Sequence, residues 1–232
     1  MSTFVLIHSP LVGPTTWAPV ADALRAAGHT AVVPSLENVS APYWAGHASA
    51  VARALDGLVP GERIVLVGHS GAGPLLPSIG QAAGRPVAAY VFVDADLPRE
   101  GASRLDLFAT VGDADAFRRS ARDGVLPPWG ESWPDGAWER LVPDGALRGR
   151  FRAELRAVAL AVYEEPLPVF DGWPDSPCAY LKFSPVYDGA AAAARETGWA
   201  YRELAGLHLH MLVDPAAVAG ALIDLARDCK AP

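Results

Sequence analysis

The sequence predicts an α/β fold built on a doubly wound, mainly parallel sheet. Short, uninterrupted apolar runs rich in β-branched residues recur along the chain, at residues 4–7, 64–67 and 87–93. Such runs are typical of strands that are buried on both faces, as they are in parallel sheets. Helical stretches lie between the runs, and this alternation indicates parallel strands. We therefore expect catalytic residues in the loops at the carboxyl ends of the strands.

The composition fits one domain, or one domain with an insertion. The chain has 232 residues, 51% of them hydrophobic, which is enough for a sizeable core. Its net charge of −7 argues against nucleic acid and membrane surfaces as partners, and no apolar run reaches the length of a membrane span. The two cysteines, Cys178 and Cys229, are too few for a disulfide framework. With no signal peptide visible, we expect a cytoplasmic protein.

The first part of the chain supplies four strands and the helices between them. Trp17 opens an amphipathic helix that Gly28 closes, and Pro34 ends the second strand. In order, we expect a strand at 4–7, a loop at 8–13, a helix at 17–27, a strand at 31–33, a helix at 43–58, a strand at 64–67 with a helix after it, and a strand at 87–93.

The regular alternation breaks from residue 99 to residue 168. No strand-like run is visible there, and we expect helices at 113–122, 136–141 and 145–164 between turns rich in Gly and Pro. We interpret this segment as a helical cap, inserted into a core of residues 1–98 and 169–232. Trp129 and Trp133 either line an apolar substrate cavity beneath the cap or hold its short helices together.

The last part of the chain returns to strands and helices. We expect a strand at 178–183, a loop at 184–188 with a helix after it that runs to 197, a strand at 200–204, a loop at 205–211 and a final helix at 215–227. Asp214 and Pro215 have the residue types preferred at a helix N-cap and first helical position.

The turn Gly-His-Ser-Gly-Ala-Gly at residues 68–73 joins a buried strand to a helix. Small neighbours allow Ser70 the strained backbone of a nucleophile elbow, which exposes its hydroxyl at the top of the sheet. The Gly71 N–H then lies at a helix start, where it can donate to an oxyanion. The motif departs from G-x-S-x-G at Ala72. A phosphate-binding or dinucleotide-binding loop is disfavoured, because the turn has no lysine and Leu76 replaces the third glycine.

These features together resemble the α/β-hydrolase superfamily, in particular its compact esterase and hydroxynitrile lyase branch. They are a His-x-x-x-x-Gly loop from His8, the helix opened by Trp17, the Ser70 turn, a cap after the following strand, and a late histidine ahead of an Asp-Pro helix start. The resemblance covers nearly the whole chain. It implies an α/β-hydrolase fold with a helical cap, on which hydrolases, lyases, dehalogenases and cyclases all occur.

The resemblance implies that His208 is the general base. In the superfamily the base follows a glycine and precedes the last helix, as His208 lies between Gly206 and Pro215. It would take the Ser70 proton as the hydroxyl attacks. His210 is the alternative and points the opposite way in an extended segment. Zinc is disfavoured, because no third acidic or cysteine ligand lies at a suitable spacing.

The resemblance leaves two main candidates for the catalytic acid, with Asp96 a distant third that we interpret as a cap or loop residue. In most members the acid follows the strand expected here at 178–183, which points to Asp188, although Tyr187 occupies the expected position. In a branch that resembles the haloalkane dehalogenases, the acid ends the strand after the serine turn, where Asp94 lies. We favour Asp94, because a carboxylate at the end of a buried strand is costly without a partner.

The oxyanion hole departs from the family pattern. Its second N–H donor falls at Pro10, and proline has no N–H. Loss of one donor costs about 2.7–4 kcal/mol of transition-state stabilisation, unless the Ser9 hydroxyl or the Leu11 N–H replaces it. The expected oxyanion and substrate-binding residues are Gly71, Ser9, Leu11 and His8, together with Trp129 and Trp133.

The function implied is a serine hydrolase acting on a small to mid-sized apolar ester, thioester or lactone. The alternative is a cyclase, lyase or dehydratase of secondary metabolism that uses Ser70 and His208 for acid–base chemistry; a non-enzymatic ligand-binding relative is a third reading. Leu209 replaces the lysine that follows the histidine in hydroxynitrile lyases, which argues against cyanohydrin chemistry. We expect no cofactor or metal and a small-molecule substrate as partner, and the sequence leaves a homodimer open.

Overall fold

The fold is organised by a six-stranded sheet in the order β2-β1-β3-β4-β7-β8. The computed structural model describes residues 2–37, 39–108 and 111–229. All five strand pairs of this sheet are parallel, which confirms the predicted fold class. The strands are β1 (Thr3–Ile7), β2 (Thr30–Val32), β3 (Ile64–His69), β4 (Val87–Val93), β7 (Cys178–Lys182) and β8 (Ala200–Glu203).

The winding of the sheet reverses at β1. The chain passes from β1 outward to β2, then returns to place β3 on the other side of β1, with Phe4 opposite Val65 in the register. The loops that leave β1 and β3 begin at His8 and Ser70, so both start at the reversal point. Ligands of open parallel sheets bind at such a point, because the loops diverge there and leave a crevice.

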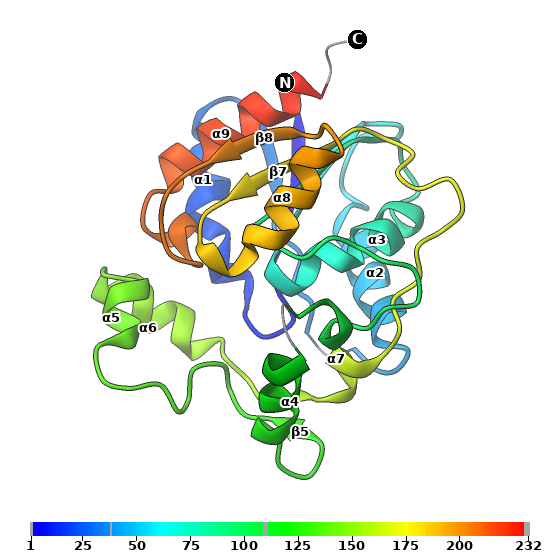
Figure 1. Cartoon of the computed structure of the whole chain (residues 1–232). Helices are drawn as coiled ribbons and strands as arrows, with labels where there is room; N and C mark the ends of the chain where they lie inside the picture. Colours follow the sequence, from blue (N-terminus) through cyan, green and yellow to red (C-terminus); the bar gives the residue numbers. More distant parts are fainter. Residues whose placement is uncertain (1, 38, 109–110, 230–232) are drawn as a thin grey trace.

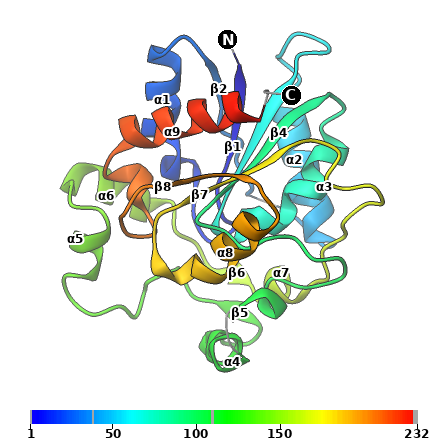
Figure 2. The same ribbon diagram turned by 45° about the horizontal axis from the view of Figure 1, so that its top comes forward.

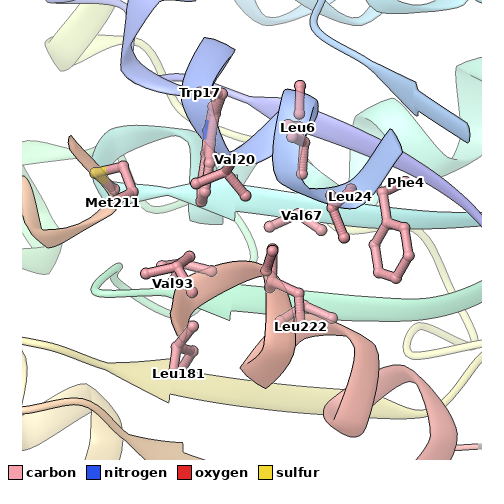
Figure 3. Close-up of a cluster of buried hydrophobic side chains, with 14 of the residues drawn as sticks. Phe4, Leu6, Trp17, Val20, Leu24, Val67, Val93, Leu181, Met211 and Leu222 are labelled. Carbon is pink, nitrogen blue, oxygen red and sulfur yellow. The ribbon is translucent and has the colours of Figure 1, made fainter. Parts of the chain in front are cut away.

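Helices cover both faces of the sheet (Figures 1 and 2). Helices α1 (Ala18–Ala26) and α9 (Pro215–Asp228) pack on one face, and α2 (Tyr43–Ala54), α3 (Leu76–Ala82) and α8 (Asp188–Glu196) pack on the other. Successive side chains of a strand point to opposite faces of the sheet, so each strand contributes residues to the hydrophobic core on both sides. Along β1, Phe4 and Leu6 join the cluster under α1 and α9, and Figure 3 shows them there with Leu222 of α9. Val5 and Ile7 join the cluster under α2 and α3.

The segment between β4 and β7 holds most of the remaining structure. Its elements are a 3-10 helix η3 (Leu105–Leu107), α4 (Val111–Ser120), β5 (Val125–Leu126), α5 (Ala137–Leu141), α6 (Gly145–Ala153), β6 (Val158–Ala159) and α7 (Ala161–Glu164). Helices α4, α5 and α6 lie at the end of the molecule opposite the two chain termini (Figure 1). They therefore lie near the carboxyl ends of the strands. The assignment of residues 99–168 to a separate cap stays a prediction.

Two expectations for this segment were wrong. Strands β5 and β6 form an antiparallel pair where no strand was expected, and the single helix expected at 145–164 is split into α6 and α7. The pairing explains the split. The Leu160 N–H donates to the Gly124 carbonyl at 2.8 Å, so the backbone between the two helices bonds across the pair rather than along a helix.

The helix ends differ from the expectations by small amounts. A 3-10 helix, η1 (Pro14–Thr16), precedes α1, and α2 ends at Ala54 rather than at residue 58. The predicted N-cap of α9 is confirmed, because the Asp214 carboxylate accepts the Ala217 N–H at 2.9 Å. Within the described ranges, no helix is both long and apolar enough to cross a membrane.

Candidate active site

Ser70 lies at the sharp turn between β3 and the helices that follow it. It is the first residue of the 3-10 helix η2 (Ser70–Leu75), and α3 continues from there. Its φ of 55° is in the left-handed region, which side chains other than glycine rarely adopt. Residues held in this way cluster at active sites, where the fold around them enforces the strain. The turn therefore has the geometry expected of a nucleophile elbow.

The glycines around Ser70 are required by close packing. A Cβ on Gly68 would lie 3.0 Å from Leu76 Cγ, and a Cβ on Gly73 would lie 2.5 Å from the Asp96 carbonyl oxygen. The backbone of the serine turn therefore comes closest to the loop after β4 at Gly73. Ala72 is fully buried but keeps its methyl group, which explains why alanine is tolerated at the fifth position of the motif.

Asp94 and His208 form a buried pair next to this turn. Asp94 directly follows β4, has a φ of 43° and is 0% exposed. Its Oδ2 accepts a hydrogen bond from His208 Nδ1 at 2.7 Å and one from Ser184 Oγ at 2.6 Å. Its Oδ1 accepts the N–H groups of Phe183 and Ser184 at 3.0 and 2.8 Å. Four donors therefore satisfy a carboxylate that the sheet removes from water.

These donors keep Asp94 ionised. Burial alone would raise the pKa of Asp94, but the hydrogen bonds and charge of His208 and the hydrogen bonds of Ser184 outweigh it, so the pKa lies below its usual value. An ionised Asp94 accepts from Nδ1 of His208, which fixes the proton on that nitrogen. Nε2 is then left as the basic nitrogen of the ring.

His69 anchors the loop that carries His208. Its Nε2–H donates to the His208 carbonyl oxygen at 3.0 Å, and the two rings lie 4.4 Å apart between centroids. Burial and the neighbouring His208 hold the pKa of His69 well below its usual value, so its ring stays neutral. The residue before the serine therefore positions the loop of the candidate base.

His210 lies on a different side of the same loop. It begins the 3-10 helix η5 (His210–Leu212) and packs edge-on against Phe183, with centroids 5.5 Å apart. A Cβ on Gly206 would lie 2.5 Å from His210 Nδ1, so that glycine makes room for this ring. Across the described ranges, no three His, Cys, Asp or Glu side chains are grouped to hold a metal ion.

Asp188 is not brought to His208. It starts α8 with its carboxylate 65% exposed, and it pairs with Lys182 Nζ at 3.0 Å. Tyr187 takes the inward position one residue earlier, at the end of the 3-10 helix η4 (Pro185–Tyr187). Of the two candidate acids, the structure therefore places Asp94 and not Asp188 against the imidazole.

Tyr187 is a site residue whose role the sequence did not predict. Its hydroxyl forms a hydrogen bond with Ser70 Oγ at 3.1 Å, and its ring stacks on His208 with centroids 5.4 Å apart. Among the described residues, Ser70 has no hydrogen bond to His208. Ser70 Oγ and the imidazole must therefore come into hydrogen-bond contact before the imidazole can take the serine proton. The available signal was that Tyr187 replaces the aspartate of the common family pattern.

A cavity of about 380 Å³ opens beside Ser70 and His208. Most of its other lining is apolar or aromatic. Trp129 and Trp133 both line it and also pack against one another, with ring centroids 4.7 Å apart, so the structure is compatible with both roles that the sequence left open. The Trp129 ring is 6.1 Å from that of His208, so it lies close to the candidate base. The apolar and aromatic lining residues are Leu11, Val12, Pro74, Phe108, Phe117, Trp129, Trp133, Leu141, Tyr163, Val186, Tyr187 and Leu209.

Three of the expected oxyanion residues line this cavity, namely Ser9, Leu11 and Gly71. The Leu11 N–H donates to Ser9 Oγ at 3.5 Å, so it is directed at the serine oxygen. His8 is not brought to the cavity. Its ring is buried, Nδ1 donates to the Ser9 carbonyl at 2.9 Å, and it lines a second hollow of about 310 Å³.

Two charged residues of the cavity wall were not predicted as site residues. Burial raises the pKa of Asp96 to about 7, so this carboxyl titrates near neutral pH. Arg104 is 2% exposed and donates from Nε to the Gly71 carbonyl at 2.9 Å. Arg104 comes from the segment between β4 and β7, and its approach to the serine turn depends on tertiary packing that no local pattern reveals.

Comparison with known proteins gives consistent matches. A family model described as the alpha/beta hydrolase family matches residues 4–221. Esterase PIR7B of Oryza sativa subsp. japonica is 34% identical over 139 residues, which cover 53% of this chain and 47% of that protein. In that match the chain spans about half the length of the rice protein. A carbendazim hydrolyzing esterase of Nocardioides sp. (strain SG-4G) is 25% identical over 216 residues, 82% of this chain and 87% of that protein.

A solved structure shows the same fold. An extracellular alpha/beta-hydrolase from a Paenibacillus species superimposes with a TM-score of 0.78 at 19% identity, over 98% of this chain and 100% of that one. At this level of identity the likeness concerns the fold.

Proposed function

The chain belongs to the alpha/beta hydrolase family, and on that premise we propose that it is a serine hydrolase of small to mid-sized apolar esters, thioesters or lactones. Ser70 is the nucleophile, His208 the general base and Asp94 the acid that orients His208. The observation that carries the proposal is the 2.7 Å hydrogen bond from His208 Nδ1 to the fully buried Asp94. A carboxylate at the end of a buried strand requires a partner, and this partner lines the same cavity as Ser70.

The proposed reaction begins with rotation of the Ser70 hydroxyl from Tyr187 toward His208. Nε2 of His208 takes the serine proton as Oγ forms a bond to the substrate carbonyl carbon, and the π electron pair moves onto the carbonyl oxygen. The Gly71 N–H and the Ser9 hydroxyl donate to that oxygen. When the C=O bond re-forms, the C–O bond to the alcohol breaks and the proton passes from His208 to the leaving oxygen. Water then attacks the acyl-enzyme by the same route.

The cavity supports the proposed substrate class. Its volume of about 380 Å³ and its predominantly apolar lining suit a small, uncharged acyl group. The names of two relatives, a rice esterase and a Nocardioides esterase that hydrolyses carbendazim, support ester hydrolysis.

The second candidate is a cyclase, lyase or dehydratase on the same scaffold. Two observations favour it. Pro10 offers no N–H at the expected oxyanion position, and the Ser70 hydroxyl bonds to Tyr187 rather than to His208. In that reaction Ser70 and His208 move protons and no acyl-enzyme forms.

Turnover of p-nitrophenyl esters with acyl chains of two to eight carbons tests the proposal. The wild-type protein should hydrolyse them, and Ser70→Ala should lose nearly all turnover while keeping its fold by circular dichroism. Ser35→Ala is the matched control, because Ser35 is exposed and lies outside the cavity lining. Hydrolysis that survives in Ser70→Ala, or is absent from the folded wild-type protein, would contradict the hydrolase function and favour the second candidate.

A further inference from the structure

Arg104 is a buried cation that forms no direct ion pair in the described ranges, and the nearby charge of Glu165 only partly offsets the cost of its burial. Its side chain is 2% exposed, Nε donates to the Gly71 carbonyl at 2.9 Å, and Nη1 donates to the Val162 carbonyl. Nη2 has no hydrogen-bond partner, and no carboxylate in the described ranges lies within ion-pair distance of the guanidinium. Burial lowers the pKa of Arg104, but a guanidinium remains protonated in proteins.

A charge in this position is costly for the folded state. Buried charges in proteins are ordinarily paired, because removal from water is not otherwise compensated. Arg104 lines the Ser70 cavity, so an anion that forms there during a reaction would experience its field at low dielectric. An oxyanion at the attacked carbonyl is such an anion, and the Arg104 guanidinium would stabilise its negative charge.

Tyr163 connects this cation to the oxyanion region. The guanidinium carbon lies 5.6 Å from the centroid of the Tyr163 ring, and the Tyr163 hydroxyl lies 3.3 Å from Ser9 Oγ. Both hydroxyls are crowded against Gly71, where a Cβ would lie 3.0 Å from Tyr163 Oη and 3.2 Å from Ser9 Oγ. The two hydroxyls therefore surround the residue whose N–H is the expected oxyanion donor.

The hydrogen-bond pattern leaves these hydroxyls free to donate. Ser9 Oγ already accepts the Leu11 N–H at 3.5 Å, so its proton can go to Tyr163 or to a ligand. Burial raises the pKa of Tyr163, and the opposing charge of Arg104 does not reverse this, so the phenol keeps its proton at neutral pH. Pro10, beside them, contributes no N–H.

We propose that the Tyr163 hydroxyl, held beside Ser9 and supported by the buried Arg104 guanidinium, is the oxyanion donor that replaces the N–H missing at Pro10. The inference rests on the proposed hydrolase function. As Ser70 Oγ bonds to the carbonyl carbon and the π pair moves to oxygen, Tyr163 donates a hydrogen bond and keeps its proton. Tyr163 is then a catalytic residue. Arg104 is a positioning residue that acts through the Tyr163 ring and the Gly71 peptide.

An alternative role for Arg104 is recognition of a carboxylate on the substrate. The geometry favours the oxyanion role, because Nε and Nη1 are bound to backbone carbonyls and Nη2 is shielded from solvent. A substrate carboxylate could therefore not form the paired hydrogen bonds that a guanidinium with free nitrogens offers. The uncharged nitrophenyl esters and ketones of the experiment below contain no carboxylate, so they separate the two roles.

The first experiment compares Tyr163→Phe with wild type. We expect kcat for p-nitrophenyl butyrate to fall about 10²–10³-fold, the usual effect of losing one oxyanion donor, with KM changed only a few-fold. An alkyl trifluoromethyl ketone, which forms a hemiketal oxyanion with Ser70, should lose affinity by a similar factor. The matching methyl ketone, which mimics the ground state, should not. Tyr201→Phe is the matched control, because its hydroxyl bonds Glu203 at 2.9 Å outside the cavity.

The second experiment tests Arg104 through a spectroscopic signal. With a ¹³C-labelled trifluoromethyl ketone, the carbon chemical shift reports the pKa of the hemiketal oxygen. Arg104→Met should raise that pKa, and Arg104→Lys, which keeps a charge, should raise it less. Arg85→Lys is the control, because Arg85 also donates to backbone carbonyls, those of Val59 and Leu55 at 2.9 Å, but away from the site. A structural role alone would leave the hemiketal pKa unchanged.

The possible outcomes distinguish failure of the proposed hydrolase function from failure of the proposed role of Tyr163. If wild type neither hydrolyses esters nor forms the hemiketal, the proposed function fails and this inference fails with it. If wild type does both and folded Tyr163→Phe keeps kcat within three-fold, only the oxyanion role of Tyr163 is overturned. Should Tyr163→Phe fail to fold, 3-fluorotyrosine at position 163 carries the comparison, because it keeps the hydroxyl beside Ser9 and makes it more acidic. It should lower the pKa of the hemiketal oxygen, and an unchanged hemiketal pKa would overturn the role of Tyr163.

Discussion

Replacement of Asp94 by asparagine should nearly abolish ester hydrolysis while leaving the fold intact. An asparagine oxygen can still accept the N–H groups of Phe183 and Ser184, which lie 3.0 and 2.8 Å from Oδ1. Its NH₂ group would take the place of Oδ2, which now accepts from His208 Nδ1 at 2.7 Å. An NH₂ group cannot accept that hydrogen bond, so His208 must carry its proton on Nε2 instead. In that tautomer it cannot remove the Ser70 proton.

The size of the effect follows from the tautomer. The equivalent Asp-to-Asn change in a Ser-His-Asp protease lowers kcat about 10⁴-fold, which corresponds to about 5.4 kcal/mol of activation free energy. The pKa of Asp94 lies below its usual value, so the wild-type carboxylate is ionised throughout the neutral range. Protonation of Asp94 should therefore not limit the wild-type kcat between about pH 6 and pH 9.

The assay is kcat for p-nitrophenyl butyrate across this pH range, with the melting temperature measured to establish folding. Asp188→Asn is the matched control. It makes the same chemical change at a carboxylate that is 65% exposed and pairs with Lys182 at 3.0 Å, so kcat should stay within two-fold of wild type. The reasoning would be refuted if folded Asp94→Asn kept more than a tenth of the wild-type kcat, or if Asp188→Asn lost as much.

Three further predictions concern packing, titration and pocket shape. Gly73→Ala should destabilise the fold by about 1–3 kcal/mol, since its Cβ would lie 2.5 Å from the Asp96 carbonyl; urea unfolding that matches wild type would contradict this. Because burial raises the pKa of Asp96 to about 7, the folded state holds this proton more tightly than the unfolded state, and stability falls as pH rises from about 4 to 7. Asp96→Asn should therefore be more stable than wild type at pH 8, by at most roughly 4 kcal/mol, and the gain should vanish at pH 4; an equal gain at both pH values would exclude titration as its cause. Trp129→Ala should widen the cavity beside His208 and lower KM for eight-carbon acyl esters relative to two-carbon ones, and an unchanged preference would remove Trp129 from substrate contact.

The sheet and the serine turn could be predicted because their signals are local. Strands buried on both faces read as unbroken apolar runs, as Val87–Val93 does, and a parallel sheet brings their carboxyl ends to one edge. Ser70 and Asp94 each directly follow such a strand, and the two strands are neighbours in the sheet, so their proximity follows from the topology. The choice between Asp94 and Asp188 could not be settled in this way. It depends on which way the loop after β7 turns, and that loop directs Tyr187 inward.

The polar wall of the cavity could not be predicted, because it is assembled by tertiary packing. Arg104 and Tyr163 lie 59 residues apart in sequence and far from Ser9 and Gly71, yet the four residues line one cavity. No periodicity in residues 99–168 indicates this convergence. The β5–β6 pair in the same segment could not be predicted either, because strands of two residues are too short to show an alternating pattern.

Covalent labelling with a fluorophosphonate would show whether Ser70 is an activated nucleophile. The protein is incubated with the reagent, its intact mass is measured, and the modified peptide is sequenced by mass spectrometry, with Ser70→Ala alongside. We expect a single phosphonyl adduct on Ser70 in wild type and none in Ser70→Ala, because only an activated serine displaces the fluoride. A folded wild-type protein that stays unlabelled, or that carries the adduct on another residue, would contradict the claim that Ser70 is the nucleophile of a hydrolase.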